Sequence, residues 1–481
     1  MDARIFLDEF RPFRRGEIAL ARRLSVDPHL LPERELALLR HALRLAQLSS
    51  LGGEPDELVE RIGSLRLRLL QLLAPVLPTE PSQIDARRLA SRLPKVVALT
   101  TEARRRIFDA GLAGEIALDA ELANKRLVLV LGGAAGSGYV FLGALERLEQ
   151  LGIVPGYLAG CSVGSILAVV RARRRGFELA ELLADIRRLR ERGAFAAPSR
   201  PRFGLSGALR LDLRSALGEL FEVDGRQQTL ADLALPTDVL TTGLGPGALS
   251  EGESSARMID LELHSAGALE KLPRTALARL VGPLVSLAMS RQVLVPLFFG
   301  ADPETRRLAA LDAAGFSAAI PGVLSYDLGA EDTQSAQILE RIFERHSLTG
   351  LVDGALSTLI PARYAWEAIE AGRIGTRNTA IVALDALAKP RGSNALLLPL
   401  LRVASATADR DRAFWDLHVQ FRRAPNFLDI FPTDARLAAA AEHGAQEFAE
   451  TARVLPVLLA PVPAWKDLAP DAIAHVSDRF V

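Results

Sequence analysis

The sequence predicts an α/β fold with a mainly parallel sheet, preceded by an N-terminal helical region. Three observations support this prediction. Apolar residues recur at helical spacing from about residue 16 to about residue 120. A β-branched and leucine-rich run then begins at Leu127, with the character of a strand buried on both faces. Beyond it, strand-like and helix-like segments alternate, which is typical of βαβ units.

The composition is that of an ordinary globular protein. The 481 residues are 49% hydrophobic and 24% charged, which excludes the disordered, collagen-like and disulfide-stapled classes. The 58 basic and 58 acidic residues cancel, so charge gives no reason to expect a nucleic-acid partner. Cys161 is the only cysteine, which excludes an intrachain disulfide, and no His/Cys cluster has zinc spacing. We therefore expect neither a metal nor an organic cofactor.

The N-terminus does not resemble a secretory signal, because acidic residues come early and no apolar core precedes a small-residue cleavage site. A reducing, cytoplasmic compartment is the default expectation. Residues 127–145 and 151–170 carry no charge and are long enough to span a membrane. Their glycines and Pro155 instead favour a buried strand, a tight turn and a helix. For the apolar stretches 260–300 and 454–465, core packing and peripheral membrane contact both stay open.

We expect three regions along the chain. Residues 1–120 form a helical region with no recognisable catalytic constellation, and residues 35–48 show its three- and four-residue apolar spacing. This region is either a layer packed on the rest of the chain or a docking or oligomerisation surface. The α/β domain is expected at 121–455, with an apolar helical insertion at about 255–305, and a C-terminal tail at 456–481.

Within the α/β domain the elements are expected in this order. The first are a strand at 127–131, a helix at 140–150, a short strand at 157–159 and a helix at 163–174. Further strands are expected at 237–242 and 379–384, with helices at 332–344 and 363–371 between them. The stretch 260–300, interrupted by three prolines, is expected to be an inserted helical pair.

The strongest functional motif is the G-x-S-x-G stretch between the second strand and its helix. A serine nucleophile sits on a turn so tight that its neighbours can hardly carry side chains, and Gly160 and Gly164 supply that freedom. The helix after this turn aims its N–H groups and dipole at developing negative charge. Ser162 is therefore the candidate nucleophile, in an elbow completed by Cys161 and Val163. The alternative is that Ser162 only caps the helix.

The second motif is a glycine-rich loop directly after the first strand. It consists of Gly132, Gly133, Ala134, Ala135, Gly136, Ser137 and Gly138. Its row of backbone N–H groups suits an oxyanion hole or a phosphate site, but the spacing is not G-x-G-x-x-G, which disfavours a nucleotide. A turn that only lets a helix pack on the sheet is the third interpretation. Adjacent parallel strands end at one edge, so this loop and the serine elbow would lie together.

The third motif is Asp353-Gly354-Ala355, which comes directly after an apolar pair. A lone Asp-Gly is usually a turn. A serine hydrolase nevertheless needs a base, and none of the histidines after the serine lies in a recognisable catalytic context. His418 and His443 stay open as bases of a Ser-Asp-His hydrolase.

Together these stretches resemble the patatin-like phospholipase family. The resemblance covers about residues 125–450 and includes Thr237-Asp-Val-Leu-Thr-Thr-Gly and Ser317-Ala-Ala-Ile-Pro-Gly besides the three motifs. It implies a three-layer α/β sandwich with a mostly parallel central sheet, and a Ser-Asp dyad that cleaves acyl esters of lipids without histidine. By resemblance Ser162 would be the nucleophile and Asp353 its general base, with N–H groups of the loop holding the oxyanion.

The loop departs from the family pattern. The family usually has Arg or Lys where Ser137 stands, and glycine where Ala134 and Ala135 stand. Backbone donors survive these changes. The expected activity is therefore first that of a phospholipase A or lysophospholipase and second that of a broad carboxylesterase. A non-catalytic member that binds a membrane or a partner is the remaining alternative.

Overall fold

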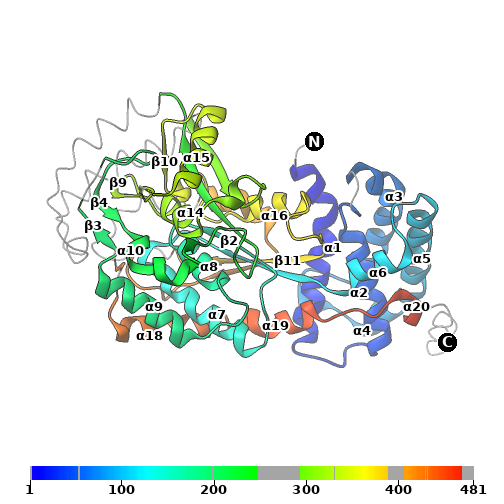
Figure 1. Cartoon of the computed structure of the whole chain (residues 1–481). Helices are drawn as coiled ribbons and strands as arrows, with labels where there is room; N and C mark the ends of the chain where they lie inside the picture. The colour runs from blue at the N-terminus through cyan, green and yellow to red at the C-terminus, as the bar shows by residue number, and fades with distance from the viewer. Residues whose placement is uncertain are drawn as a thin grey trace. The chain divides into compact units, whose positions relative to one another are not determined.

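The computed structural model describes residues 3–51, 55–197, 200–247, 293–329, 331–387, 406–427, 429–430 and 432–468 (Figure 1). The chain divides into two compact units. Unit 1 comprises residues 1–127, 366–381 and 450–481, and unit 2 comprises residues 128–365 and 382–449. The units differ from the predicted regions, because two stretches from late in the chain group with the N-terminal helices. The domain boundaries at residues 120 and 455 stay a prediction.

Unit 1 is mainly helical, which confirms the predicted N-terminal helical region. Its helices are α1 (Ala3–Leu24), α2 (Glu33–Gln47), α3 (Pro55–Leu73), α4 (Ala86–Ala90), α5 (Leu93–Asp109) and α6 (Glu115–Ala123), with α20 (Trp465–Leu468) and most of α19 (Ala449–Leu459). Leu20 of α1, Leu39 and Leu43 of α2 and Leu93 of α5 are buried in one core cluster. Residues three or four apart on a helix share one face, so this spacing produces the buried stripes.

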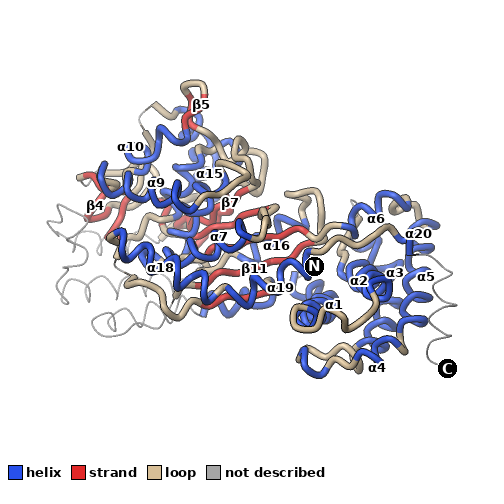
Figure 2. The backbone as a smooth tube through the Cα atoms, turned by 90° about the horizontal axis from the view of Figure 1, so that it is seen from below, coloured by secondary structure: helices blue, strands red, loops and turns tan. Residues whose placement is uncertain are grey.

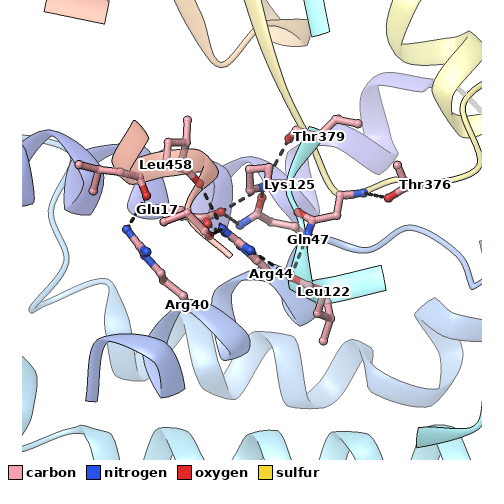
Figure 3. A network of polar contacts seen from close by, with 12 residues as sticks. Glu17, Arg40, Arg44, Gln47, Leu122, Lys125, Thr376, Thr379 and Leu458 are labelled. Atoms are coloured by element: carbon pink, nitrogen blue, oxygen red, sulfur yellow. Dashed lines mark hydrogen bonds and ion pairs between the residues drawn. The ribbon is translucent and has the colours of Figure 1, made fainter. Parts of the chain in front are cut away.

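A buried polar network joins several elements of unit 1 (Figure 3). Oε1 of Glu17, on α1, accepts a hydrogen bond from Arg44 Nε at 3.0 Å. Oε2 accepts one from Gln47 Nε2 at 2.7 Å and lies 3.1 Å from Lys125 Nζ. The remaining N–H groups of Arg44 donate to the backbone carbonyls of Leu122, Ala123, Leu458 and Ala460. One guanidinium therefore satisfies carbonyls at the ends of α6 and α19 together.

The central sheet of unit 2 has seven strands in the order β10-β7-β2-β1-β11-β12, with β8 also paired to β7. The strands are β1 (Arg126–Leu131), β2 (Tyr157–Cys161), β7 (Thr237–Leu244), β8 (Leu294–Phe299), β10 (Gly350–Val352), β11 (Thr379–Asp385) and β12 (Leu417–Gln420). The pairs β1–β2, β2–β7 and β11–β12 are parallel. Helices lie on both faces of the sheet (Figures 1 and 2), which confirms the predicted α/β sandwich.

Besides the central sheet, unit 2 contains helices that were predicted and short strands that were not. The helices are α7 (Phe141–Gln150), α8 (Val163–Ala172), α9 (Leu179–Arg192), α10 (Leu213–Leu217), α14 (Ala310–Ser317), α15 (Thr333–His346), α16 (Ala362–Glu370) and α18 (Asp434–Glu447). Two small sheets were not predicted: β3 (Phe195–Ala196), β4 (Gly207–Leu211) and β9 (Gly322–Ser325), and the hairpin of β5 (Glu222–Val223) and β6 (Arg226–Gln227). Their strands are too short to give a clear two-residue alternation.

The helical insertion predicted at 255–305 is wrong at its end. Leu294–Phe299 is strand β8, which pairs antiparallel with β7, with Phe299 opposite Val239. A short apolar run cannot be assigned to a helix or a strand from periodicity alone. Residues 248–292, which hold the rest of the predicted insertion, lie outside the described residues.

The charge-free stretches 127–145 and 151–170 contain β1 and β2, each followed by a turn and a helix, as predicted. Within the part of the chain that the structure describes, no helix has the length and apolar character needed to cross a membrane.

Helices α7 and α18 of unit 2 pack backbone to backbone. A Cβ atom added to Gly143 of α7 would lie 1.9 Å from the carbonyl oxygen of Ala441, and one added to Gly444 of α18 would lie 1.9 Å from that of Val140. No side chain fits at such a distance, so glycine is required at both positions.

Candidate active site

Ser162 occupies the turn between β2 and α8 in a strained conformation. Its φ is 53° and its ψ is −129°, a region that residues with a side chain seldom adopt. The flanking glycines make the turn possible. A Cβ atom on Gly160 would lie 2.5 Å from the Cα of Ser165, and one on Gly164 would lie 2.4 Å from the carbonyl oxygen of Leu131. The predicted need for glycine on both sides of the serine is therefore confirmed.

The strand register brings Asp353 to this turn. Val352, the last residue of β10, lies opposite Thr242 of the antiparallel strand β7. The chain after Val352 therefore heads toward Leu240, which is the partner of Cys161 at the end of β2. Asp353 is the next residue, and it arrives beside Ser162.

The hydroxyl of Ser162 donates a hydrogen bond to the carboxylate of Asp353. The distance from Oγ to Oδ2 is 2.6 Å, and both residues are buried, with 6% and 4% exposed. The other carboxylate oxygen accepts the backbone N–H of Ala355 at 2.8 Å. Two residues that stand 191 positions apart thus form one buried hydrogen-bonded pair.

The environment of Asp353 makes its carboxyl group more basic. Burial raises its pKa from 3.8 to about 6, although the hydrogen bonds from Ser162 and Ala355 oppose this effect. Among the described residues, no cation forms an ion pair with Asp353. The neighbouring Cys161 thiol is also buried, and burial followed by the charge of Asp353 raises its pKa, so it stays neutral.

The glycine-rich loop lies against the serine turn. A Cβ atom on Gly133 would lie 3.3 Å from the Cβ of Ser162, and one on Gly138 would lie 2.6 Å from Cγ1 of Val163. The predicted meeting of loop and elbow at one sheet edge is therefore observed, because Leu131 of β1 pairs with Gly160 of β2.

Most of the predicted oxyanion donors already have backbone partners. The N–H groups of Gly132, Gly133, Gly136 and Ser137 donate to the carbonyls of Leu384, Leu359, Phe427 and Ala134 at 2.9–3.0 Å. Gly138 is the fourth residue of the 3₁₀ turn Ala135–Val140, so its N–H group is used within that turn. In the described part of the chain, the N–H groups of Ala134 and Ala135 have no such acceptor. The candidate donors therefore narrow to these two residues.

A late segment of the chain covers the loop where the family pattern has a basic residue. The hydroxyl of Ser137 donates to the carbonyl of Pro425 at 2.9 Å, and the hydroxyl of Tyr139 donates to that of Ile430 at 2.5 Å. A Cβ atom on Gly136 would lie 2.3 Å from the carbonyl oxygen of Asp429. Ser137 therefore fixes the loop to this segment instead of supplying a cation.

Sequence reasoning assigned no role to residues 314–319, at the end of α14. The hydroxyl of Ser317 accepts the N–H of Ser162 at 2.9 Å and donates to the carbonyl of Leu240 at 2.5 Å. The carbonyl of Ala319 accepts the N–H of Asp353 at 2.9 Å. The only available signal was the resemblance, which includes Ser317 but does not say what it contacts.

The histidines kept as alternative bases do not contact Ser162. His418 lies on β12, which β1 and β11 separate from β2 in the sheet order. Its Nε2 is 3.3 Å from Oδ2 of Asp385, and its ring stacks on Trp415 at 4.9 Å. His443 lies on α18. Among the described residues, no cluster of three or more His, Cys, Asp or Glu side chains could hold a metal ion.

Comparison with protein-family models gives a match to the chain. Residues 129–366 match a family model described as patatin-like phospholipase. The match includes the glycine-rich loop, the serine elbow, residues 314–319 and Asp353, and it ends before the late segment that covers the loop. No protein among the curated ones matches the chain.

Proposed function

Because the chain belongs, through residues 129–366, to the patatin-like phospholipase family, we propose that it hydrolyses acyl esters of lipids through a dyad of Ser162 and Asp353. Family membership supports lipid acyl hydrolysis in general. The dyad itself is carried by one observation, the buried 2.6 Å hydrogen bond from Ser162 Oγ to Asp353 Oδ2. A hydroxyl within hydrogen-bond reach of a base is the arrangement that nucleophilic catalysis requires.

In the acylation step, Asp353 removes the proton of the Ser162 hydroxyl as Oγ forms a bond to the ester carbonyl carbon. The electrons of the C=O double bond move to its oxygen. When they return, the bond to the alcohol breaks, and the alcohol leaves with the proton that Asp353 held. The product is an acyl-serine and, from a phospholipid, a lysophospholipid.

In the deacylation step, Asp353 takes a proton from a water molecule that attacks the acyl-serine carbonyl. The tetrahedral intermediate collapses, the bond to Ser162 Oγ breaks, and Oγ recovers the proton from Asp353. A fatty acid leaves. No histidine is needed, since one carboxyl group accepts and returns the proton in both steps.

The pKa of Asp353 suits this role. A general base works best when its pKa lies near the working pH, and burial raises the pKa of Asp353 to about 6. Asp353 is ionised, and able to accept a proton, above that value. Turnover is therefore expected to rise with pH through about 6.

We assign the oxyanion to the N–H groups of Ala134 and Ala135. The N–H groups of Gly132, Gly133, Gly136 and Ser137 already donate to carbonyls, so they cannot also hold a substrate oxygen. Gly138 is the fourth residue of the 3₁₀ turn, where an N–H group bonds within the turn. Backbone donors do not depend on the side chain, so replacing glycine by alanine preserves them. This assignment also explains why Ser137 can replace a basic residue without removing the donors.

The test compares wild type with Ser162→Ala and Asp353→Asn. Fatty-acid release is measured from mixed phospholipid vesicles and from a short chromogenic ester, and labelling by a fluorophosphonate probe is measured in parallel. Both variants should lose about a thousandfold or more in turnover, as when one member of a catalytic unit is removed. Ser162→Ala should also lose labelling.

Asp385→Asn is the matched control. Asp385 is another buried aspartate that ends a strand of the same sheet, but it pairs with His418 and not with Ser162. This variant should keep its activity. If Asp353→Asn stays active while Asp385→Asn does not, the base has been assigned to the wrong carboxyl group. If wild type neither labels nor turns over either substrate, the chain is a non-catalytic member of its family.

A further inference from the structure

The end of α14 contacts both members of the proposed dyad. Ser317 accepts the backbone N–H of Ser162, and Ala319 accepts the backbone N–H of Asp353, each at 2.9 Å. Ser165, one turn into α8, donates to the carbonyl of Ser162 at 2.5 Å and lies 3.3 Å from that of Ala314. One short stretch therefore contacts two residues that directly follow different strands, β2 and β10.

Ser317 performs a task that requires a hydroxyl group. Its oxygen accepts from the N–H of Ser162 while its proton goes to the carbonyl of Leu240, so both functions of the group are used. The residue is fully buried, at 0% exposed. Without the hydroxyl, the N–H of Ser162 would be left without its partner at a buried position, which costs free energy.

The stretch is itself held firmly. Asp312, in the first turn of α14, is buried and accepts hydrogen bonds from Arg214 Nε at 2.8 Å and from the hydroxyl of Tyr326 at 2.7 Å. A Cβ atom on Gly315 would lie 2.2 Å from the ring of Tyr326. Both ends of the helix are therefore fixed, one by charge and one by close packing.

We propose that Ser317 is a positioning residue, which holds Ser162 in its left-handed turn so that Oγ points at Asp353. The proposal rests on the proposed dyad. Ser162 is in a backbone conformation that residues with a side chain seldom adopt, and such conformations persist only when surrounding contacts impose them. The hydrogen bond to Ser317 is a contact on the strained residue's own N–H group.

Loss of this contact has a measurable consequence beyond a lower rate. When the turn relaxes, the Ser162 hydroxyl moves away from Asp353, and a hydrogen bond that lowers the pKa of Asp353 is lost. Among the described residues, the N–H of Ala355 and the neutral thiol of Cys161 also face this carboxylate. The pKa of Asp353 should therefore rise, and the acid limb of the pH–rate profile should move to higher pH.

The experiment compares Ser317→Ala with Ser325→Ala. Ser325 is equally buried, but its hydroxyl donates to the carbonyl of Leu209 in the small sheet and does not contact the dyad. In Ser317→Ala, kcat should fall about 10- to 100-fold with KM changed less than threefold, as expected from misplacing a reacting group. Its fluorophosphonate labelling should slow to a similar extent. Ser325→Ala should keep the wild-type kcat, labelling rate and acid limb.

The outcomes separate this proposal from the proposed function. If Ser162→Ala and Asp353→Asn are inactive but Ser317→Ala keeps the wild-type kcat and acid limb, the dyad stands and the positioning role is overturned. If Ser317→Ala and Ser325→Ala lose activity equally, with equal falls in melting temperature, the role of Ser317 is general packing. Ser317→Cys restores a weaker donor and acceptor of similar size, so it should recover part of the kcat.

Discussion

Glu17 in unit 1 and Asp353 in unit 2 are both buried carboxylates, at 2% and 4% exposed, but their surroundings differ. Glu17 has Arg44 at 3.0 Å and Lys125 at 3.1 Å, whereas Asp353 has one hydroxyl and one backbone N–H as partners. At equal burial, the partners therefore decide what the group can do. A carboxylate neutralised by two cations holds chain segments together, and one without a cation is available to take a proton.

The two groups also respond to pH in opposite ways. Burial alone would raise the pKa of Glu17, but Lys125, Arg44 and Gln47 outweigh it and lower the pKa to about 2. Glu17 therefore stabilises the fold above pH 4.5, and this stability is lost as the pH falls toward 2. Asp353 has a raised pKa, so its native form binds more protons than the unfolded chain between about pH 4 and pH 6, and stability falls as the pH rises through that range.

The largest change in unfolding free energy is expected from removing the charge of Glu17. Glu17→Gln leaves the buried Arg44 and Lys125 without a counterion, which typically costs about 3–5 kcal/mol of unfolding free energy. Denaturant unfolding at pH 7 measures it. Glu450→Gln is the control, since Glu450 is exposed and its ion pair with Arg22 spans 3.7 Å, so its loss should cost less than about 1 kcal/mol. Equal losses in the two variants would mean that the Glu17 network is not a special source of stability.

Asp353→Asn is expected to change the free energy of unfolding by a smaller amount and in the opposite direction, toward greater stability. At pH 8 the raised pKa of Asp353 corresponds to about 3 kcal/mol of lost stability, from 1.36 kcal/mol for each pKa unit. The amide is uncharged, so the variant should gain about 2–3 kcal/mol of unfolding free energy at pH 8. This gain should shrink toward zero by about pH 4, where the wild-type carboxyl group is protonated as well. Melting curves of wild type and variant across this range measure it. A variant that is less stable than wild type at pH 8 would contradict the view that Asp353 is held at a cost to the fold.

The smallest effect is expected at His418, which tests whether the dyad needs a third member. His418→Gln should change fatty-acid release by less than twofold, because the hydroxyl of Ser162 is bonded to Asp353 and His418 is paired with Asp385. The exposed His346 provides the control, His346→Gln. A loss above tenfold in His418→Gln alone would favour a Ser-Asp-His hydrolase.

Features fixed by local geometry could be predicted from the sequence. The strand beginning near Leu127, the serine turn and its meeting with the glycine-rich loop follow from buried apolar runs and from glycines that a tight turn requires. The family resemblance supplied the pairing of residues that lie far apart. The structure then narrowed the candidate oxyanion donors to Ala134 and Ala135, because other N–H groups of the loop donate to carbonyls. Most of those carbonyls lie far away in the sequence, so the local sequence pattern could not predict these hydrogen bonds.

Features that depend on distant contacts could not be predicted. In the sequence, Ser317 is an ordinary small residue near the end of a helical segment. Only its hydrogen bond with the N–H of Ser162 indicates that it positions the serine turn. The sequence around Glu17 and Lys125 likewise contains no pattern that predicts their ion pair. Strand β8 was missed for a different reason, since a six-residue apolar run with a proline fits a buried helix as well as a strand on β7.

The close crossing of Gly143 and Gly444 bears on which fragments of this chain could be studied. Helix α7 continues directly from the glycine-rich loop, and α18 comes after the segment whose carbonyls accept from Gly136, Ser137 and Tyr139. A fragment trimmed to the family match at 129–366 would keep Ser162 and Asp353. It would lose the partner helix of α7, the three carbonyls that accept from Gly136, Ser137 and Tyr139, and the carbonyl of Leu384, which accepts from Gly132. The shortest fragment able to reproduce the site therefore extends at least through α18.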